Sequence, residues 1–242
     1  MILKILVLVA SVAQVVGAAY LSIGTFEQSV RELPVFIQPA GWAFSIWGLI
    51  YTLSFVYAVY QIIPRYDNAL LKQTRLPALL GFSGSIAWLF FAGMTNWTVW
   101  LTIPILFAMA LVFIRIVNAR NTNDKWQTIF SKDILLPYAA WTGIAAWVNV
   151  QALLVDQSIV TSSAINMTTN ALLFVGLAIF TLFYFKRTMY SPWYGGVMVW
   201  AGMAVVAANL ESGSTWFALI AGTFALLSAG LILAAPRTIQ GR

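Results

Sequence analysis

Four aligned side chains on one predicted helix are the arrangement in this chain that points most directly to ligand binding. The apolar run at 133–154 contains Tyr138, Trp141, Ala145 and Asn149. At about 100° per residue, these four side chains fall within about 80° of one another on a helix. A phenol, an indole, a small gap and an amide on one face suit a large, flat, apolar ligand that carries a few hydrogen-bonding groups. A helix that only faced lipid would need neither the phenol nor the amide.

Asn149 carries the strongest constraint within this group. An unpaired amide in hydrocarbon costs several kcal/mol, so this side chain must face protein, water or ligand. Hydrogen bonding between helices is the alternative explanation, and Gly143 and Ala145 would then simply allow close helix approach.

Two earlier helices add aromatic faces. Phe44, Trp47 and Tyr51 share one face within about 80°, and Trp88 lies well inside the third predicted span with an indole N–H that needs a partner. Packing between helices would explain these aromatic residues as well as a pocket does.

The composition defines the fold class. The chain has 242 residues, of which 61% are hydrophobic and 8% charged, and its mean hydropathy is +0.86. This composition is typical of a polytopic membrane protein, and backbone pairing in lipid favours helices. We therefore predict an all-α membrane helix bundle. About eight apolar runs are long enough to cross a bilayer: 5–23, 41–62, 78–95, 99–118, 133–154, 163–185, 194–210 and 215–235.

Charged residues alternate between the loops. All but one of the 13 basic residues fall on one predicted face of the membrane. They are Lys4, Arg65, Lys72, Arg75, Arg115, Arg120, Lys125, Lys132, Lys186, Arg187, Arg237 and Arg242. The opposite loops hold Arg31 with Glu27, Glu32, Asp156 and Glu211. The positive-inside rule then predicts that both termini are cytoplasmic. The net charge of +6 is explained in this way, and no nucleic-acid partner is expected.

The residue types that are missing exclude several chemistries. The chain has no His and no Cys, which excludes thiol nucleophiles, His-based acid–base catalysis and His-ligated haem iron, and disfavours a metal site. No catalytic residue and no required cofactor is predicted. No Asp, Glu or Lys lies in the middle of a predicted span, which disfavours proton-coupled pumping.

The aromatic segments resemble the signatures of a known membrane family. Pro137, Tyr138, Trp141, Ala145 and Asn149 resemble the fifth-helix signature of the translocator protein family, also called tryptophan-rich sensory proteins (TspO/MBR). The string from Pro39 to Tyr51 is similar to its second-helix signature, and the segment 88–91 is similar to its third helix. The resemblance covers residues 1 to about 155.

The resemblance implies a five-helix ligand-binding unit at 1–155, followed here by a three-helix membrane extension at 156–242. It implies a porphyrin, another tetrapyrrole or a lipidic ligand, and also a homodimer in the plasma membrane of a bacterium or archaeon. The predicted ligand-binding residues are Phe44, Trp47, Tyr51, Trp88, Tyr138, Trp141, Ala145, Val148 and Asn149. The predicted entrance residues are Pro39, Gly41 and Trp42. The Tyr and Arg of the family's proposed cholesterol motif are missing from 150–157, and a sterol is therefore disfavoured as the ligand.

Three functions follow as hypotheses. The first is a membrane receptor or sensor that binds a tetrapyrrole-like or lipidic ligand in an aromatic pocket within the bilayer. The second is an eight-helix transporter of a neutral or amphipathic small molecule. The third, oxidative breakdown of a porphyrin, is disfavoured because the chain lacks His and Cys.

Overall fold

Long apolar helices dominate the computed structural model, which describes residues 1–21, 33–94 and 97–235. Among these residues, eight helical segments are long and apolar enough to cross a membrane. The predicted all-α membrane bundle is therefore confirmed. The predicted loop charges Glu27, Arg31, Glu32, Arg237 and Arg242, and the far ends of the first and third predicted spans, lie outside the described residues.

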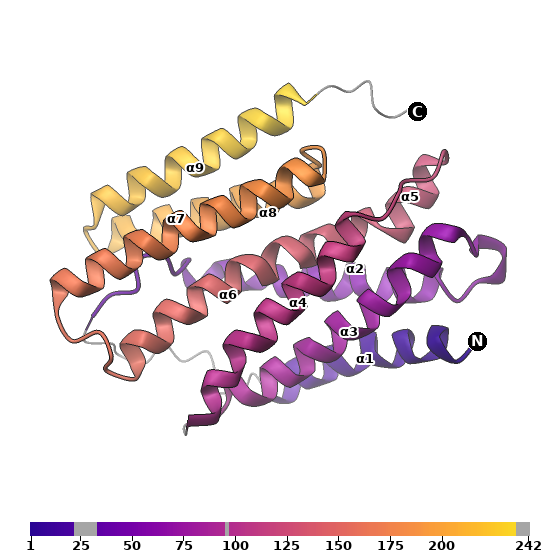
Figure 1. Ribbon diagram of the computed structural model, residues 1–242, viewed down its shortest axis with the longest axis horizontal. Helices are drawn as coiled ribbons and strands as arrows, with labels where there is room; N and C mark the ends of the chain where they lie inside the picture. Colours follow the sequence, from indigo (N-terminus) through magenta and orange to yellow (C-terminus); the bar gives the residue numbers. More distant parts are fainter. Residues whose placement is uncertain (22–32, 95–96, 236–242) are drawn as a thin grey trace. The chain divides into compact units, whose positions relative to one another are not determined.

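Contacts between residues divide the chain into two compact units. Figure 1 labels the helices of both units. The N-terminal unit contains α1 (Ile2–Leu21) and the described residues of 46–139. The C-terminal unit contains 33–45 and 140–234. This division falls inside a helix and differs from the predicted boundary at 155, which stays a prediction.

The N-terminal unit is built around one central helix. Its helices are α1, α2 (Ile46–Tyr60), α3 (Ala69–Ala92), α4 (Thr102–Val117), the short α5 (Lys125–Ser131) and the start of α6 (Leu136–Asp156). α3 packs against both α1 and α4, and α1 also packs against α2. Because α3 touches two neighbours, buried side chains recur along it from Leu70 to Leu89, whereas Leu76, Leu80 and Phe90 are exposed.

α3 begins nine residues earlier than the sequence suggested. Asn68 caps the helix by accepting a hydrogen bond from the backbone N–H of Leu71 at 2.8 Å. Pro77 lies inside the helix, and Arg75 is buried although it is charged. The prediction started at 78 because a proline and basic residues resemble a loop.

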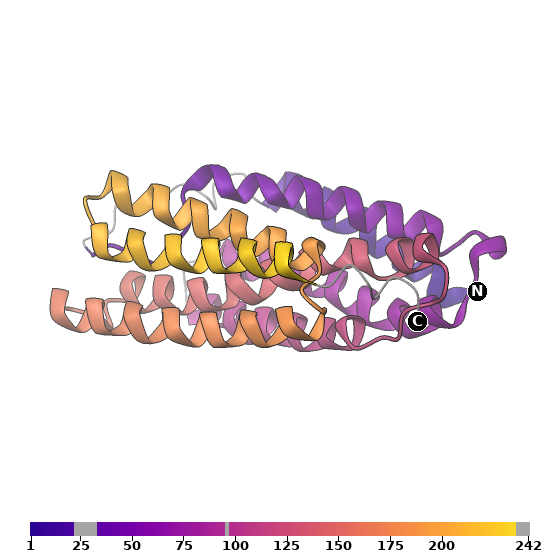
Figure 2. The same cartoon turned by 90° about the horizontal axis from the view of Figure 1, so that it is seen from above.

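The C-terminal unit contains most of α6, followed by α7 (Ser163–Arg187), α8 (Pro192–Glu211) and α9 (Thr215–Ala234). α8 and α9 lie side by side in both views (Figures 1 and 2). Gly213, with a φ of 75°, makes the tight turn between them. The segment 33–45 also belongs to this unit and ends in a 3-10 turn, η1 (Gly41–Ser45), which packs on α8.

Candidate ligand-binding site

α6 carries the predicted line of side chains in one unbroken helix from Leu136 to Asp156. Pro137 lies in the first turn, where its missing N–H costs little. Tyr138, Trp141 and Ala145 are buried, and Asn149 is half-buried. The Nδ2 group of Asn149 donates to the carbonyl oxygen of Ala145 at 2.9 Å, one turn earlier on the same helix.

Four of the predicted ligand-binding residues meet in the N-terminal unit. Trp47 is the centre of this aromatic cluster. Its ring centroid lies 5.3 Å from that of Tyr51, 5.6 Å from that of Trp88 and 5.8 Å from that of Tyr138. Trp47 and Trp88 are stacked, whereas Trp47 and Tyr138 meet edge to face. These four residues, from α2, α3 and the start of α6, are called the aromatic cluster below.

The aromatic cluster also contains hydrogen-bonding groups. The hydroxyl of Tyr138 donates to Oε1 of Gln14 on α1 at 2.9 Å. The hydroxyls of Tyr51 and Ser85 lie 3.3 Å apart. The indole N–H of Trp88 is buried, and no described residue accepts a hydrogen bond from it. A buried donor of this kind normally finds an acceptor, which a ligand or a water molecule can supply.

The C-terminal unit holds the other predicted ligand-binding residues. Phe44 meets Trp141 edge to face, with ring centroids 5.8 Å apart. Val148 and Ala145 are buried on α6. Among the predicted ligand-binding residues, the structure thus brings Phe44 and Trp141 together in this unit and the four residues of the aromatic cluster together in the other.

The predicted entrance residues lie in the segment 33–45. Pro39 is buried, and Gly41 is exposed. Trp42 is about half exposed and meets Trp200 of α8 edge to face, with ring centroids 4.9 Å apart. Trp200 therefore covers part of a residue that the sequence assigned to the ligand entrance.

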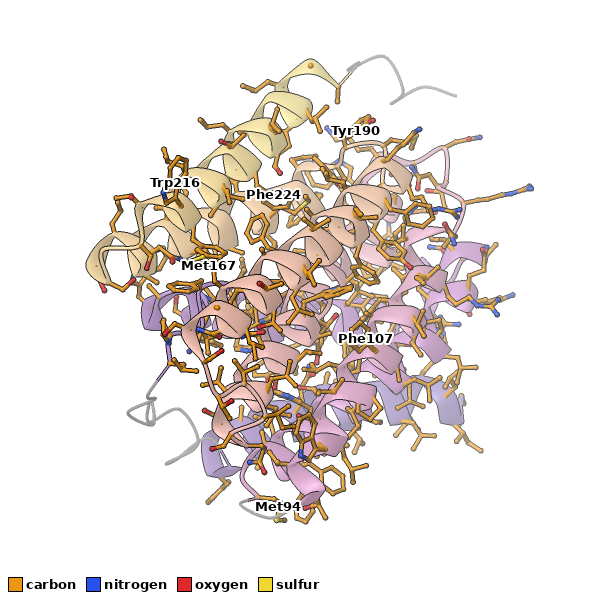
Figure 3. The ribbon with its side chains drawn as sticks, turned by 60° about the vertical axis from the view of Figure 1, so that its left-hand side comes forward. Met94, Phe107, Met167, Tyr190, Trp216 and Phe224 are labelled. Carbon is orange, nitrogen blue, oxygen red and sulfur yellow. The ribbon has the colours of Figure 1, made fainter. Side chains whose placement is uncertain are left out.

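A small cavity lies within the C-terminal unit. Its volume is about 20 Å³, which is room for one water molecule but far less than a tetrapyrrole needs. All of its lining residues are apolar, and one of them, Phe224 of α9, is labelled in Figure 3. The full lining is Ile37, Ile144, Phe174, Leu177, Ala178, Ala201, Gly202, Val205 and Phe224.

Three charged side chains, Lys4, Asp67 and Arg75, lie close together in the N-terminal unit. Asp67 accepts a hydrogen bond from the buried Arg75 at 2.7 Å and forms an ion pair with Lys4 at 3.3 Å. Arg75 also donates to Oε1 of Gln61 at 3.1 Å. The hydrogen bond from Arg75 is the main reason why the pKa of Asp67 is lowered from its usual value. This cluster ties the first turn of α1 to the connection between α2 and α3.

No described group of three or more His, Cys, Asp or Glu residues could hold a metal ion. The aromatic cluster instead offers ring faces and hydroxyl and indole groups. Such a set can hold an apolar ring system and its polar substituents, but it supplies no strong ligand for a metal.

Sequence reasoning missed several buried amides that the structure connects to the predicted residues. Gln14 on α1 forms a hydrogen bond with Tyr138. The segment 33–45, which contains the predicted entrance residues, forms hydrogen bonds with Asn166, Asn170 and Asn209. Each is fully or almost fully buried. The available signal was an amide inside a membrane-length apolar run, the same signal that singled out Asn149.

The membrane-length helices of the described residues, with the apolar composition of the chain, define an integral membrane protein built as a polytopic α-helical bundle. A family model described as TSPO-like protein matches residues 1–235, so the chain belongs to the TSPO-like protein family. The family resemblance inferred from the aromatic signatures is confirmed, and the match extends beyond residue 155 to include α7, α8 and α9. No curated protein and no solved structure matches the chain.

Proposed function

We propose that this protein is a membrane receptor or sensor that binds a tetrapyrrole-like or lipidic apolar ligand through its aromatic residues. The observation that carries the proposal is the indole N–H of Trp88, buried beside stacked aromatic rings without an acceptor among the described residues. A ligand with an apolar ring surface and a hydrogen-bond acceptor would satisfy both the rings and this donor.

The chemistry of the aromatic cluster limits the ligand. The rings of Trp47, Tyr51 and Tyr138 favour a flat apolar surface, because aromatic faces pack well against one. The nearby polar groups are neutral amide, hydroxyl and indole groups, so charge on the ligand would have to lie outside the cluster. A porphyrin with peripheral carboxylates and an apolar macrocycle fits these conditions.

Binding in the aromatic cluster requires the rings to move. Trp47 and Trp88 stack on each other with centroids 5.6 Å apart, so a flat ligand must separate them. The contact between the rings of Trp47 and Trp88 is then replaced by contacts between each ring and the ligand. Ligand binding should therefore change tryptophan fluorescence directly.

The test is a titration of the purified protein with protoporphyrin, followed by quenching of tryptophan fluorescence. Replacing Trp88 with Phe keeps an aromatic ring but removes the N–H donor, and the affinity should fall roughly 10-fold because one buried hydrogen bond is lost. Trp126→Phe is the matched control, since Trp126 lies exposed on the short helix α5. Equal affinity of Trp88→Phe and the control variant would contradict the proposed role of Trp88.

The proposal includes a location and an assembly. The protein would lie in a bacterial or archaeal plasma membrane with both termini in the cytoplasm, and it would form a homodimer, as the family resemblance implies. The distribution of basic residues along the chain supports the orientation.

An eight-helix transporter is the second candidate, and one observation favours it. Each of the two compact units contains four of the eight candidate spans, counting α6 with the unit that holds most of it. Transporters often consist of two units that move against each other. Counterflow of protoporphyrin in proteoliposomes would support transport, whereas saturable binding without counterflow would favour a receptor.

A further inference from the structure

The segment 33–45 is held in the C-terminal unit by side chains of α7 and α8. Nδ2 of Asn166 on α7 donates to the carbonyl oxygen of Pro34 at 2.9 Å. Nδ2 of Asn209 on α8 donates to the carbonyl oxygen of Phe36 at 2.8 Å. Both asparagines are almost completely buried, so leaving their amides unpaired would be costly.

A second asparagine of α7, Asn170, also bonds the segment. Oδ1 of Asn170 accepts a hydrogen bond from the backbone N–H of Ile37 at 3.3 Å. Its Nδ2 group donates to the carbonyl oxygen and to Oδ1 of Asn166 at 2.9 and 3.0 Å. Gln151 of α6 also donates to Oδ1 of Asn166 at 2.8 Å. These bonds fix the orientation of the two asparagine amides that contact the segment.

Further along the segment, α8 makes two more bonds. The backbone N–H of Ala40 donates to the carbonyl oxygen of Ala204 at 3.0 Å. The indole N–H of Trp200 donates to the carbonyl oxygen of Ala43 at 3.0 Å. The two bonds lie on either side of Gly41 and Trp42 in the sequence, so they fix both ends of the stretch that contains these predicted entrance residues.

Apolar contacts reinforce the hydrogen bonds. Phe36 stacks on Phe217 of α9 with ring centroids 4.5 Å apart and planes 8° from parallel. Ile37 is completely buried and lines the small apolar cavity of this unit. The segment is thus a packed part of the C-terminal unit rather than a solvated connection.

We propose that α7 and α8 position the ligand entrance, with Asn166, Asn170 and Asn209 as the positioning residues. The inference deepens the proposed function and rests on it for its consequence on ligand exchange. It gives the helices beyond residue 156 a specific role: they hold the segment of Pro39, Gly41 and Trp42 that a five-helix unit alone would leave without these partners. Because Phe44 at the end of the segment meets Trp141, another predicted ligand-binding residue of the same unit, releasing the segment should speed both entry and exit of the ligand.

The positioning can be measured without any ligand, because the chain has no native cysteine. Ala40→Cys places one thiol at a buried position of the segment, and a membrane-impermeant maleimide reports its exposure in purified protein. Adding Asn209→Leu should speed labelling roughly 10-fold, because a buried hydrogen bond to Phe36 is lost. Asn170→Leu should act in the same direction through Ile37.

Two controls separate release of the segment from general loosening of the fold. Thr181→Val removes a buried hydroxyl that bonds only within α7, to Leu177 and Ala178, and should leave labelling at Ala40→Cys unchanged. Val197→Cys reports on a buried position near the other end of α8, and Asn209→Leu should not speed its labelling. Unchanged labelling at Ala40→Cys, or equal acceleration at both cysteines, would overturn the proposal.

The consequence for the ligand is measured separately with protoporphyrin in stopped-flow experiments. Asn209→Leu should raise the association and dissociation rates together by a similar factor and leave the equilibrium affinity nearly unchanged. A lower affinity with unchanged association would show that Asn209 does not act on entry. If wild-type protein does not bind protoporphyrin, the porphyrin form of the proposed function fails, while the labelling result still decides whether the asparagines hold the segment.

Discussion

At the residue scale, buried hydrogen-bonding groups among apolar side chains determine what this protein can hold. Tyr138 bonds Gln14, Tyr51 lies beside Ser85, and Trp88 keeps a buried donor without an acceptor among the described residues. In hydrocarbon an unpaired polar group is costly, so each of these groups either fixes a helix contact or receives a ligand. The sequence identified Tyr138, but it could not show that its partner lies 124 positions earlier on α1.

The bond between Tyr138 and Gln14 can be tested with a double-mutant cycle. Tyr138→Phe should lower the free energy of unfolding by about 1–2 kcal/mol, because Oε1 of Gln14 loses its donor in a buried site. Adding Gln14→Leu should recover most of the loss, since both polar groups are then replaced by apolar ones. Thermal unfolding in detergent measures both effects, and additive losses would argue against a direct bond.

Asp67 predicts a specific pH dependence of stability. Its pKa in the folded protein is lowered, chiefly by the hydrogen bond from Arg75. The stabilisation is therefore fully present above the unfolded pKa of about 4 and is lost as the pH falls through the lower folded pKa. Because Asp67 is about a third exposed, the effect on stability is small.

The measurement is the melting temperature in detergent from about pH 6 down to about pH 3, a range that spans the unfolded pKa. Asp67→Asn should lower the melting temperature at the upper end and flatten its decline at the lower end. Glu211→Gln, at an exposed position in the other unit, serves as the control. If Asp67→Asn follows the same pH curve as wild type, the ion pair with Arg75 does not stabilise the fold.

At the element scale, the sequence predicted the number and type of the membrane helices, but some of their boundaries were wrong. Apolar runs of membrane length are a strong signal, and all eight became helices. The start of α3 was missed because its first turns carry Lys72, Arg75 and Pro77, which tertiary contacts and the Asn68 cap accommodate. The short helix α5 was missed because it has only seven residues and lies in a connection between two spans; Asp124 caps it.

Close packing between α8 and α9 makes a prediction at this scale. A Cβ added at Gly202 would lie 2.9 Å from Cβ of Ala225 and 3.3 Å from the carbonyl oxygen of Ala221. The backbone of α9 cannot move cheaply, so Gly202→Ala should destabilise the protein by about 1–3 kcal/mol. Gly196→Ala, in the same helix with nothing within 4 Å of the added Cβ, should be neutral or slightly stabilising. Equal melting temperatures of the two variants would contradict the close approach.

At the scale of the whole molecule, the match to the family model includes residues of both compact units. The match covers residues 1–235, so the three helices after residue 156 are part of what the family model describes. The fold class and the family could be predicted, because composition and aromatic signatures are local properties of the chain. The attachment of the segment 33–45 to α7 and α8 could not, because helical periodicity identifies a buried face but not its distant partner.

The proposed orientation in the membrane is testable on the cysteine-free chain. Asn123→Cys and Thr215→Cys place single thiols at exposed positions in the connections before α5 and at the start of α9. The positive-inside rule puts the first position in the cytoplasm and the second outside. An impermeant maleimide should therefore label Thr215→Cys on intact cells and Asn123→Cys only after lysis. The reverse pattern would show that the termini face outward.

The central claim is that aromatic residues of this protein bind a tetrapyrrole-like ligand, and an equilibrium protoporphyrin titration tests it most directly. The double variant Tyr51→Phe, Trp88→Phe keeps two aromatic rings but removes two hydrogen-bonding groups of the aromatic cluster, on which the proposal rests, and Trp126→Phe provides the control. Saturable binding to wild type and control, with roughly a 10-fold or greater loss of affinity in the double variant, is the predicted result. Equal affinity of all three proteins, or no saturable binding to the wild type, would contradict the account.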